Sequence, residues 1–140
     1  MSDMNTICYL NTDLDLVSPD DLVELTSALE SRGVFSLSPT LGNDGLMYIT
    51  FETLASYIEP EANINAMVTA IESSLMDGTA PHNEAWWRCT KHEFNIGYDC
   101  GDEPWAFQQG LSVGLLSRMS ALGISLRWTL YPPAGQVEPC

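Results

Sequence analysis

Basic residues are scarce in this chain. Of its 140 residues, five are Lys or Arg and 19 are Asp or Glu, so the formal net charge at pH 7 is -14. Sequence-independent binding to nucleic acid depends on cationic contacts with phosphate groups, so this composition argues against it. Binding to an anionic membrane surface is disfavoured for the same reason. A basic protein remains a suitable partner, because an acidic surface attracts it.

The chain also lacks long apolar runs and closely spaced cysteines. No stretch approaches 18 uninterrupted apolar residues, so we expect no transmembrane helix. Residues Met1–Asn5 carry no basic start and lead into no apolar run of signal length, so we expect no secretion signal. Scattered cysteines without a Cys-x-x-Cys pair favour free thiols in a cytoplasmic protein. The four cysteines are Cys8, Cys89, Cys100 and Cys140.

The common catalytic and cofactor-binding motifs are absent from the sequence. It contains no G-x-x-x-x-G-K-[ST], G-x-G-x-x-G, G-x-S-x-G or H-E-x-x-H. Cys89 and His92 lie three residues apart in a segment expected to be extended, so their side chains would point to opposite faces and would not chelate one metal. Asp13 and Asp15 resemble a D-x-D pair, but the acids around them lack the spacing of a calcium loop. We therefore expect no cofactor, no metal site and no enzymatic activity.

Hydrophobic periodicity and turn residues divide the chain into eight elements. The segment Ser18-Pro19-Asp20-Asp21 is typical of a helix start, because Ser caps helices, Pro fits the first turn and acids favour the N-terminus. Residues 11–17 are polar and predict a loop. The predicted strands cover residues 6–10, 34–38, 46–52, 84–100 and 124–131, and the predicted helices cover residues 19–32, 60–76 and 112–122.

The order of these elements, β-α-β-β-α-β followed by α-β, predicts the α+β class. The first six match the ferredoxin-like arrangement, in which helices cover one face of a mostly antiparallel sheet. The last helix and strand would form a C-terminal extension of that sheet. We expect one domain over residues 1–133 and a C-terminal tail over residues 134–140.

The negative charge is concentrated in the first part of the chain. Residues 1–87 contain 14 acids and one base, whereas residues 88–140 contain five acids and four bases. A helix start explains only some of these acids, because Asp13 and Asp15 precede it, and Asp20 and Glu24 would repel each other on one helix face. We interpret the excess as a surface that binds a cationic partner, with plain solubility as the alternative. The candidate partner-binding residues are Asp13, Asp15, Asp20, Asp21, Glu24, Glu52, Glu59, Glu61 and Trp105.

Tryptophans provide candidate anchors for such a partner. Trp105 lies in an acidic loop and is the preferred candidate, with burial against the core as the alternative. Trp86 and Trp87 are adjacent in a predicted strand, so one should enter the core and the other should face the opposite side.

Three segments and a final tyrosine in the last third of the chain carry a family resemblance. They are Phe94-Asn95-Ile96-Gly97-Tyr98, Gly110-Leu111-Ser112, Leu122-Gly123-Ile124-Ser125-Leu126 and Tyr131. In this order they resemble the end of a family of small bacterial proteins of unknown function, and the opening strand, acidic loop and Ser-Pro-Asp-Asp helix start look similar too. Members of that family occur among immunity proteins that protect bacteria from contact-delivered toxins. The resemblance implies a toxin-neutralising role and brings no catalytic motif.

These observations lead to the hypothesis of a cytoplasmic, acidic, protein-binding inhibitor, most simply an immunity protein that neutralises a basic bacterial toxin. One alternative is a phage protein that blocks a host defence complex by imitating nucleic acid. Another is a small ligand-binding domain or enzyme with a pocket beneath Trp105 and His92. An adjacent toxin gene would favour the first reading, phage structural genes the second, and a deep pocket with convergent polar groups the third.

Overall fold

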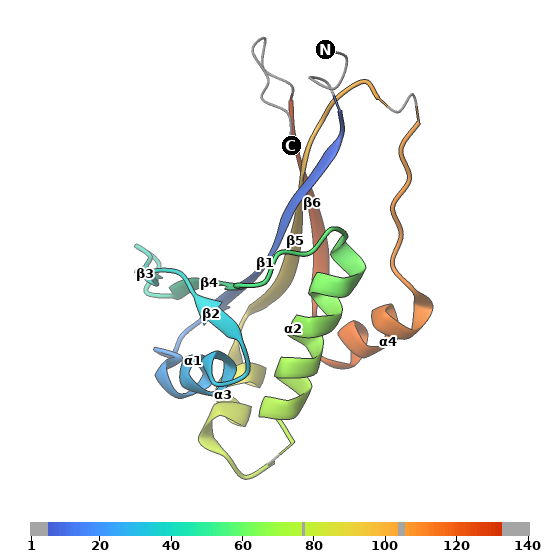
Figure 1. The fold of residues 1–140 in the computed structure, drawn as a ribbon. Helices are drawn as coiled ribbons and strands as arrows, with labels where there is room; N and C mark the ends of the chain where they lie inside the picture. The colour runs from blue at the N-terminus through green and yellow to red at the C-terminus, as the bar shows by residue number, and fades with distance from the viewer. Residues whose placement is uncertain (1–5, 77, 104–105, 133–140) are drawn as a thin grey trace.

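The computed structural model describes residues 6–76, 78–103 and 106–132, and within them the chain forms a sheet and four helices (Figure 1). The predicted tail over residues 134–140 lies outside the described residues, as does Trp105. The strands are β1 (Cys8–Ser18), β2 (Val34–Ser36), β3 (Thr40–Leu41), β4 (Met47–Thr53), β5 (Lys91–Asp99) and β6 (Ser125–Tyr131). The helices are α1 (Val23–Glu30), α2 (Pro60–Ser74), α3 (Pro81–Arg88) and α4 (Val113–Ala121).

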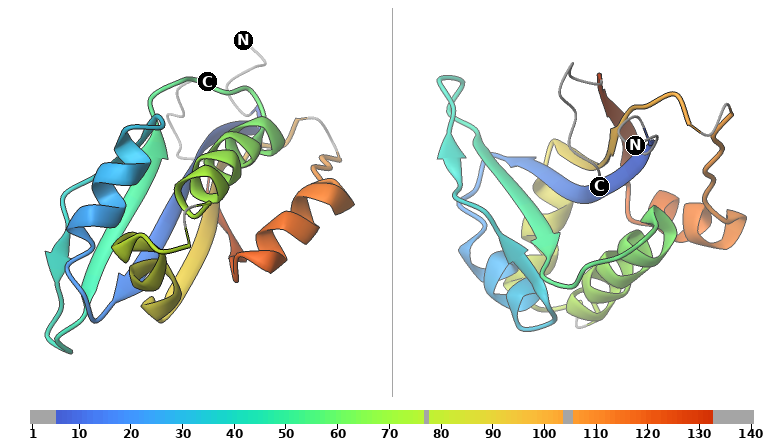
Figure 2. Two further views of the ribbon diagram at one scale, coloured as in Figure 1. Left: turned by 90° about the horizontal axis from the view of Figure 1, so that it is seen from below. Right: turned by 45° about the horizontal axis from the view of Figure 1, so that its top comes forward.

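The sheet has the strand order β2-β4-β1-β5-β6, with β3 also paired to β4. Each neighbouring pair is antiparallel except β5 and β6, which are parallel. The helices lie on one side of this sheet, and the other side is open (Figure 2). The prediction of an α+β fold with a mostly antiparallel sheet is therefore confirmed.

Alternation along the strands separates an apolar face from a polar one. In β1 the side chains of Leu14 and Leu16 are buried under the helices, while those of Asp13 and Asp15 face the open side. The strands β4 and β5 repeat this alternation, and the helices add their own apolar faces to a single core. Its largest fully buried side chains include Trp86, Phe51, Phe94, Leu22, Leu25, Ile64 and Met67.

The predicted loop over residues 11–17 is wrong, because this segment is the middle of the central strand β1. Its backbone pairs on one edge with β4 and on the other with β5. The acids that suggested a loop are compatible with a strand here because the open face of the sheet leaves their carboxylates partly exposed.

The predicted helix start at Ser18 is also wrong, since α1 begins at Val23. Ser18 is the last residue of β1 and is buried, and its hydroxyl accepts the backbone N–H of Asp20. Leu22 precedes the helix in the left-handed conformation, with φ of 61°. The Asp21 carboxylate accepts the N–H of Val23 at 3.1 Å, so it satisfies one free donor of the first turn. Asp20 and Glu24 therefore do not share one helix face.

Residues 81–88, most of which were predicted to be extended, form helix α3. Pro81 occupies its first turn, where the missing N–H costs nothing. Trp86 is fully buried and donates its indole N–H to the Leu122 carbonyl at 3.2 Å. Trp87 is 54% exposed, so the two tryptophans differ in burial as expected, although a helix and not a strand produces the difference.

Cys89 and Cys100 carry free thiols, whereas Cys8 is disulfide-bonded. The expectation of four free thiols is therefore wrong at Cys8, and Cys140 lies outside the described residues. In the described part of the chain, no helix has the length and apolar character needed to cross a membrane.

Candidate functional site

The structure divides the predicted acidic residues among three places. One group lies on the open face of the sheet, the second lies where β1 leads into α1, and the third lies around the start of α2. These groups are Asp13, Asp15 and Glu52; Asp20, Asp21 and Glu24; and Glu59 and Glu61.

The three acids on the open face of the sheet are half-buried, and each accepts a hydrogen bond from a neighbouring side chain. The side-chain amide of Asn11 donates to Asp13 at 3.2 Å and to Glu52 at 2.9 Å. The Thr50 hydroxyl donates to Asp15 at 2.7 Å. Burial, with repulsion from Asp15 and Glu52, raises the pKa of Asp13 to about 6. The three carboxylates therefore repel one another, and a cation bound beside them would reduce this repulsion.

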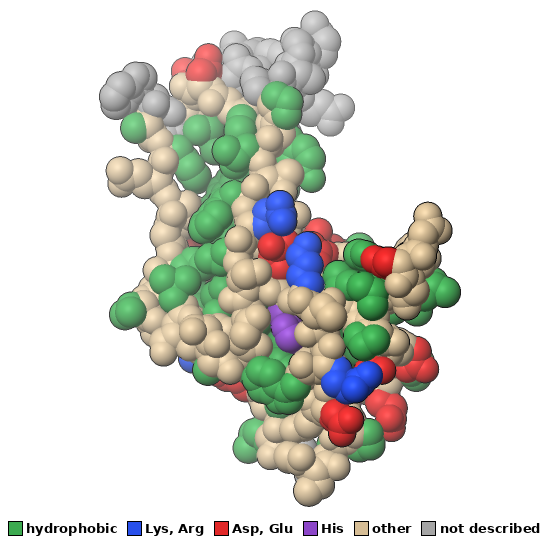
Figure 3. All heavy atoms as spheres, turned by 180° about the vertical axis from the view of Figure 1, so that it is seen from behind, with side chains coloured by type: hydrophobic (Ala, Val, Ile, Leu, Met, Phe, Trp, Pro, Cys, Tyr) green, Lys and Arg blue, Asp and Glu red, His purple; other side chains and the backbone are tan. Residues whose placement is uncertain are grey.

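The basic residues on this face already have partners. Glu93 in β5 lies 2.8 Å from Arg127 in β6 and 3.2 Å from Lys91. The hydrogen bond from Arg127, aided by Lys91, lowers the pKa of the Glu93 carboxyl. Acidic and basic side chains lie side by side in the view from behind, next to hydrophobic side chains (Figure 3).

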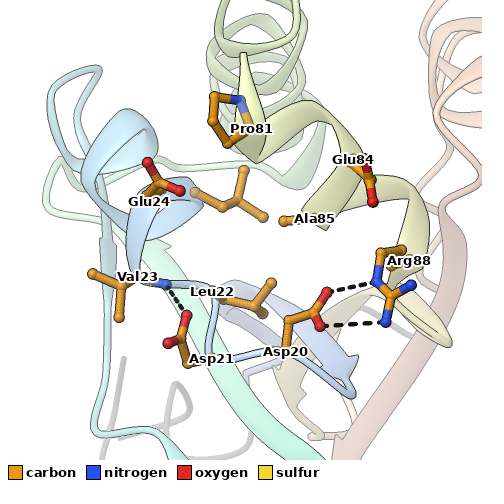
Figure 4. Close-up of a pocket in the computed structure, with 10 residues that line it drawn as sticks. Asp20, Asp21, Leu22, Val23, Glu24, Pro81, Glu84, Ala85 and Arg88 are labelled. Carbon is orange, nitrogen blue, oxygen red and sulfur yellow. Dashed lines mark hydrogen bonds and ion pairs between the residues drawn. The ribbon is translucent and has the colours of Figure 1, made fainter. Parts of the chain in front are cut away.

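The second group belongs to a hollow of about 410 Å³ between the start of α1 and helix α3. Glu24 and Val23 lie at one end of it, and Asp20 and Arg88 lie at the other (Figure 4). We call this hollow the α1–α3 pocket. Its lining residues are Asp20, Asp21, Leu22, Val23, Glu24, Leu25, Pro81, Glu84, Ala85 and Arg88.

Local structure places carboxylates around an apolar floor in the α1–α3 pocket. The side chains of Leu22 and Leu25 are buried beneath it, and Ala85 and Pro81 of α3 complete its apolar wall. The left-handed backbone of Leu22 turns the chain from β1 into α1 while keeping the leucine side chain in the core.

The charge of the pocket is strongly negative. The pocket is lined by four carboxylates and a single guanidinium, that of Arg88, which leaves an excess of three negative charges. Arg88 lies 2.9 Å from Asp20, and this hydrogen bond, with attraction to Asp20 and Glu84, raises the arginine pKa. Asp21 and Glu24 are exposed and have no basic partner among the described residues.

One acid of the third group, Glu61, has a structural role. The Glu61 carboxylate accepts the backbone N–H of Ser112 at 2.8 Å, which lowers its pKa and ties α2 to the N-cap of α4. Glu59 is exposed beside Ile58, which is 94% exposed. This group is therefore separate from the α1–α3 pocket and contributes nothing to its lining.

Glu84 and Arg88 line the pocket but were not among the candidate residues. The predicted strand over residues 84–100 gave no sign of this pocket, because an extended chain would separate the two side chains along its length. Pro81 followed by an acid in the first turn and a base in the last is a helix signal that could have revealed them.

No metal-binding cluster occurs in the residues that the structure describes. Cys89 and His92 do not share a ligand position, because the Cys89 thiol donates to the Ala85 carbonyl while His92 bonds the Trp86 carbonyl at 2.6 Å. The His92 ring also packs against Trp86, with ring centroids 4.2 Å apart, and burial lowers its pKa.

Comparison with known proteins gives no match: no family model, no curated protein and no solved structure is similar to this chain.

Proposed function

We propose that this chain is an acidic protein-binding inhibitor that holds a cationic side chain of a basic protein in the α1–α3 pocket. The simplest such protein is an immunity protein that neutralises a bacterial toxin. The observation that carries the proposal is the excess of three negative charges around an apolar floor in a hollow of about 410 Å³.

This combination suits a lysine or arginine side chain. Both have an apolar stem and a charged end, so the stem can pack on Pro81 and Ala85 while the end meets the carboxylates. Glu24 and Asp21 are the acids best suited to pair with it, since Arg88 already occupies Asp20. The protein interior on one side of the pocket has a low dielectric constant, which strengthens an ion pair here relative to one on an open surface.

The acids of the open sheet face add long-range attraction. Asp13, Asp15 and Glu52 belong to the same strongly acidic first part of the chain, and the net charge of -14 steers basic proteins toward the molecule. Contact by a partner cation with this face would also favour the ionised form of Asp13.

The third reading, a ligand-binding domain or enzyme built around His92, has less support. The His92 imidazole is hydrogen-bonded to the Trp86 carbonyl and packs against the Trp86 ring, so it is part of the packing between α3 and β5. A phage inhibitor that imitates nucleic acid uses the same acidic chemistry as an immunity protein, and it differs in the partner that it captures.

We also propose that the sheet without β3 and β6 is ferredoxin-like. Two features support this: β4 lies between β2 and β1, and β5 lies on the other side of β1, with antiparallel pairing throughout. A cytoplasmic location belongs to the proposal as well, although the disulfide at Cys8 is more typical of oxidising compartments.

Comparative capture from the source cell tests the proposed function. The bait proteins are the wild type, a pocket variant with Asp21→Lys and Glu24→Lys, and a control with Asp102→Lys and Glu103→Lys. Both variants change the net charge equally, and all four positions are exposed. We expect one basic protein in stoichiometric amount with the wild type and the control, and its loss with the pocket variant.

The identity and behaviour of the captured protein complete the test. A toxin whose activity falls on addition of the wild type supports an immunity protein, whereas a nucleic-acid-binding defence subunit supports the phage reading. Equal capture by all three baits would contradict the pocket assignment, and no stoichiometric basic protein with the wild type would contradict the proposed function.

A further inference from the structure

Strand β6 ends the sheet with an edge that pairs with no other strand in the described chain. The Cys100 N–H donates to the Tyr131 carbonyl at 2.9 Å, so the backbone polar groups of Tyr131 face β5. These groups alternate sides along a strand, so those of Leu126, Trp128 and Leu130 point to the free edge. A row of unpaired N–H and C=O groups can accept a further strand.

Leu126 packs against the core, but the side chains of Trp128 and Leu130 are poorly covered. All three residues lie beside Phe94, Ile96 and Tyr98 of β5, which are buried under the helices. Trp128 is nevertheless 49% exposed and Leu130 is 61% exposed. The helix layer therefore stops short of the middle and end of β6, and an added strand would continue the apolar face of the sheet.

Two apolar hollows lie beside this edge. One, of about 390 Å³, is lined by α4 and the start of β6, including Leu116 and Leu126. The other, of about 280 Å³, is lined by Phe107, Trp128 and Leu130 together with Tyr98. Leu126 and Leu130 thus each stand at the rim of a hollow, at equal distances along the strand from Trp128.

The charge around β6 favours a second copy of this chain as the occupant. Arg127 is the only charged residue in β6, and it is paired with Glu93 at 2.8 Å. Residues 88–140 are nearly neutral, with five acids and four bases, while the rest of the chain carries most of the negative charge. Two acidic molecules therefore repel each other least when they meet at this edge.

We propose that β6 pairs with β6 of a second copy, antiparallel and around a two-fold axis at Trp128. In this register Trp128 faces Trp128, and Leu126 faces Leu130 of the second copy, so all outward-pointing groups fall in hydrogen-bonded pairs. Each Leu130 then lies next to the Leu116–Leu126 hollow of the other copy. The proposal uses no residue of the α1–α3 pocket and is independent of the proposed function.

The mass of the full chain in solution tests this interface. We expect the wild type to reach twice its 15.4 kDa chain mass in sedimentation or light scattering as the concentration rises from about 1 μM to about 200 μM. Trp128→Lys places a charge on the edge strand and should raise the dimer dissociation constant at least about 10-fold. Leu41→Lys, on the opposite edge in β3, is the matched control and should leave the constant unchanged.

Cross-linking tests the register. In a Cys100→Ser background, Trp128→Cys should form an intermolecular disulfide, because facing Cα atoms of a hydrogen-bonded pair lie about 5.5 Å apart, within disulfide range. Leu130→Cys should not cross-link to itself, since its copies lie on opposite sides of the axis. A wild type that stays at the single-chain mass would overturn the proposal, as would a dimer that Trp128→Lys leaves intact. Circular dichroism confirms that each variant is folded.

Discussion

Leu22 is the only non-glycine residue with a positive φ in the described chain, and its side chain is buried. A left-handed backbone costs an ordinary residue on the order of 1 kcal/mol, while glycine adopts it freely. The leucine is therefore a compromise, in which burial of the side chain in the core offsets the cost of the backbone. This compromise positions Asp21 and Glu24 on either side of the turn.

Substitutions at Leu22 should separate the contributions of the buried side chain and of the left-handed backbone to the free energy of unfolding. Leu22→Ala loses the buried side chain and should lower the free energy of unfolding by about 3 kcal/mol. Leu22→Gly also relieves the backbone, so it should be at least as stable as the alanine variant. At Leu25, buried in the regular part of α1, glycine should instead be about 1 kcal/mol worse than alanine. Denaturant titration measures all four, and the same order at both positions would contradict the account.

Asp13 should make stability depend on pH. Its pKa is raised in the folded protein from 3.8 to about 6, so the stability it contributes is fully present below about pH 4. This contribution is lost as the pH rises through 6 and the carboxyl ionises beside Asp15 and Glu52. Asp13→Asn should therefore raise the free energy of unfolding by about 2 kcal/mol at pH 7 and leave it nearly unchanged at pH 4.

The control for this prediction is Glu24→Gln, which removes one exposed negative charge and should preserve the pH dependence of the wild type. Urea denaturation at pH 4, 5, 6 and 7 provides the comparison. An Asp13→Asn variant that is less stable than the wild type at pH 7 would show that the Asn11 hydrogen bond outweighs the crowding of charge.

Among the elements, those with strong periodicity could be predicted from the sequence. The predicted strands 46–52 and 124–131 and helices 60–76 and 112–122 correspond closely to β4, β6, α2 and α4. Their alternating or 3.6-residue patterns reflect burial on one face, which the sequence records directly.

The elements that were predicted wrongly depend on tertiary contacts. The acids in residues 11–17 read as a loop because the open face of the sheet is not visible in the sequence. The α1–α3 pocket itself was not predicted, although three of its acids were among the candidate partner-binding residues. Asp20, Asp21 and Glu24 are local neighbours, whereas Glu84 and Arg88 join them through packing of α1 against α3.

Helices α2 and α4 are joined by one arginine. Arg118 of α4 donates to Glu72, Asn65 and Thr69 of α2, with the ion pair to Glu72 at 2.8 Å. The pair is partly exposed, so we expect Arg118→Ala to lower the free energy of unfolding by only about 1 kcal/mol. Arg118→Lys keeps the charge but not the planar fork, and should recover less than half of the loss in thermal denaturation. Full recovery would mean that charge alone matters here.

At the scale of the whole molecule, the proposed partner site and the proposed pairing edge occupy different regions. The strongly acidic first part of the chain supplies every residue of the α1–α3 pocket except Arg88, while the nearly neutral last part supplies the β6 edge. One molecule can therefore attract a basic partner at one surface and pair with its own copy at another.

Whether the α1–α3 pocket receives a cation of a basic partner is tested most directly by the association rate constant with the captured protein. For the wild type we expect this constant to fall at least about 10-fold when salt rises from about 0.05 M to about 0.5 M. The Asp21→Lys, Glu24→Lys variant should associate more slowly and with a flatter salt dependence, while the Asp102→Lys, Glu103→Lys control should resemble the wild type more closely. Equal rates and equal salt dependence for the pocket variant and the wild type would contradict the claim.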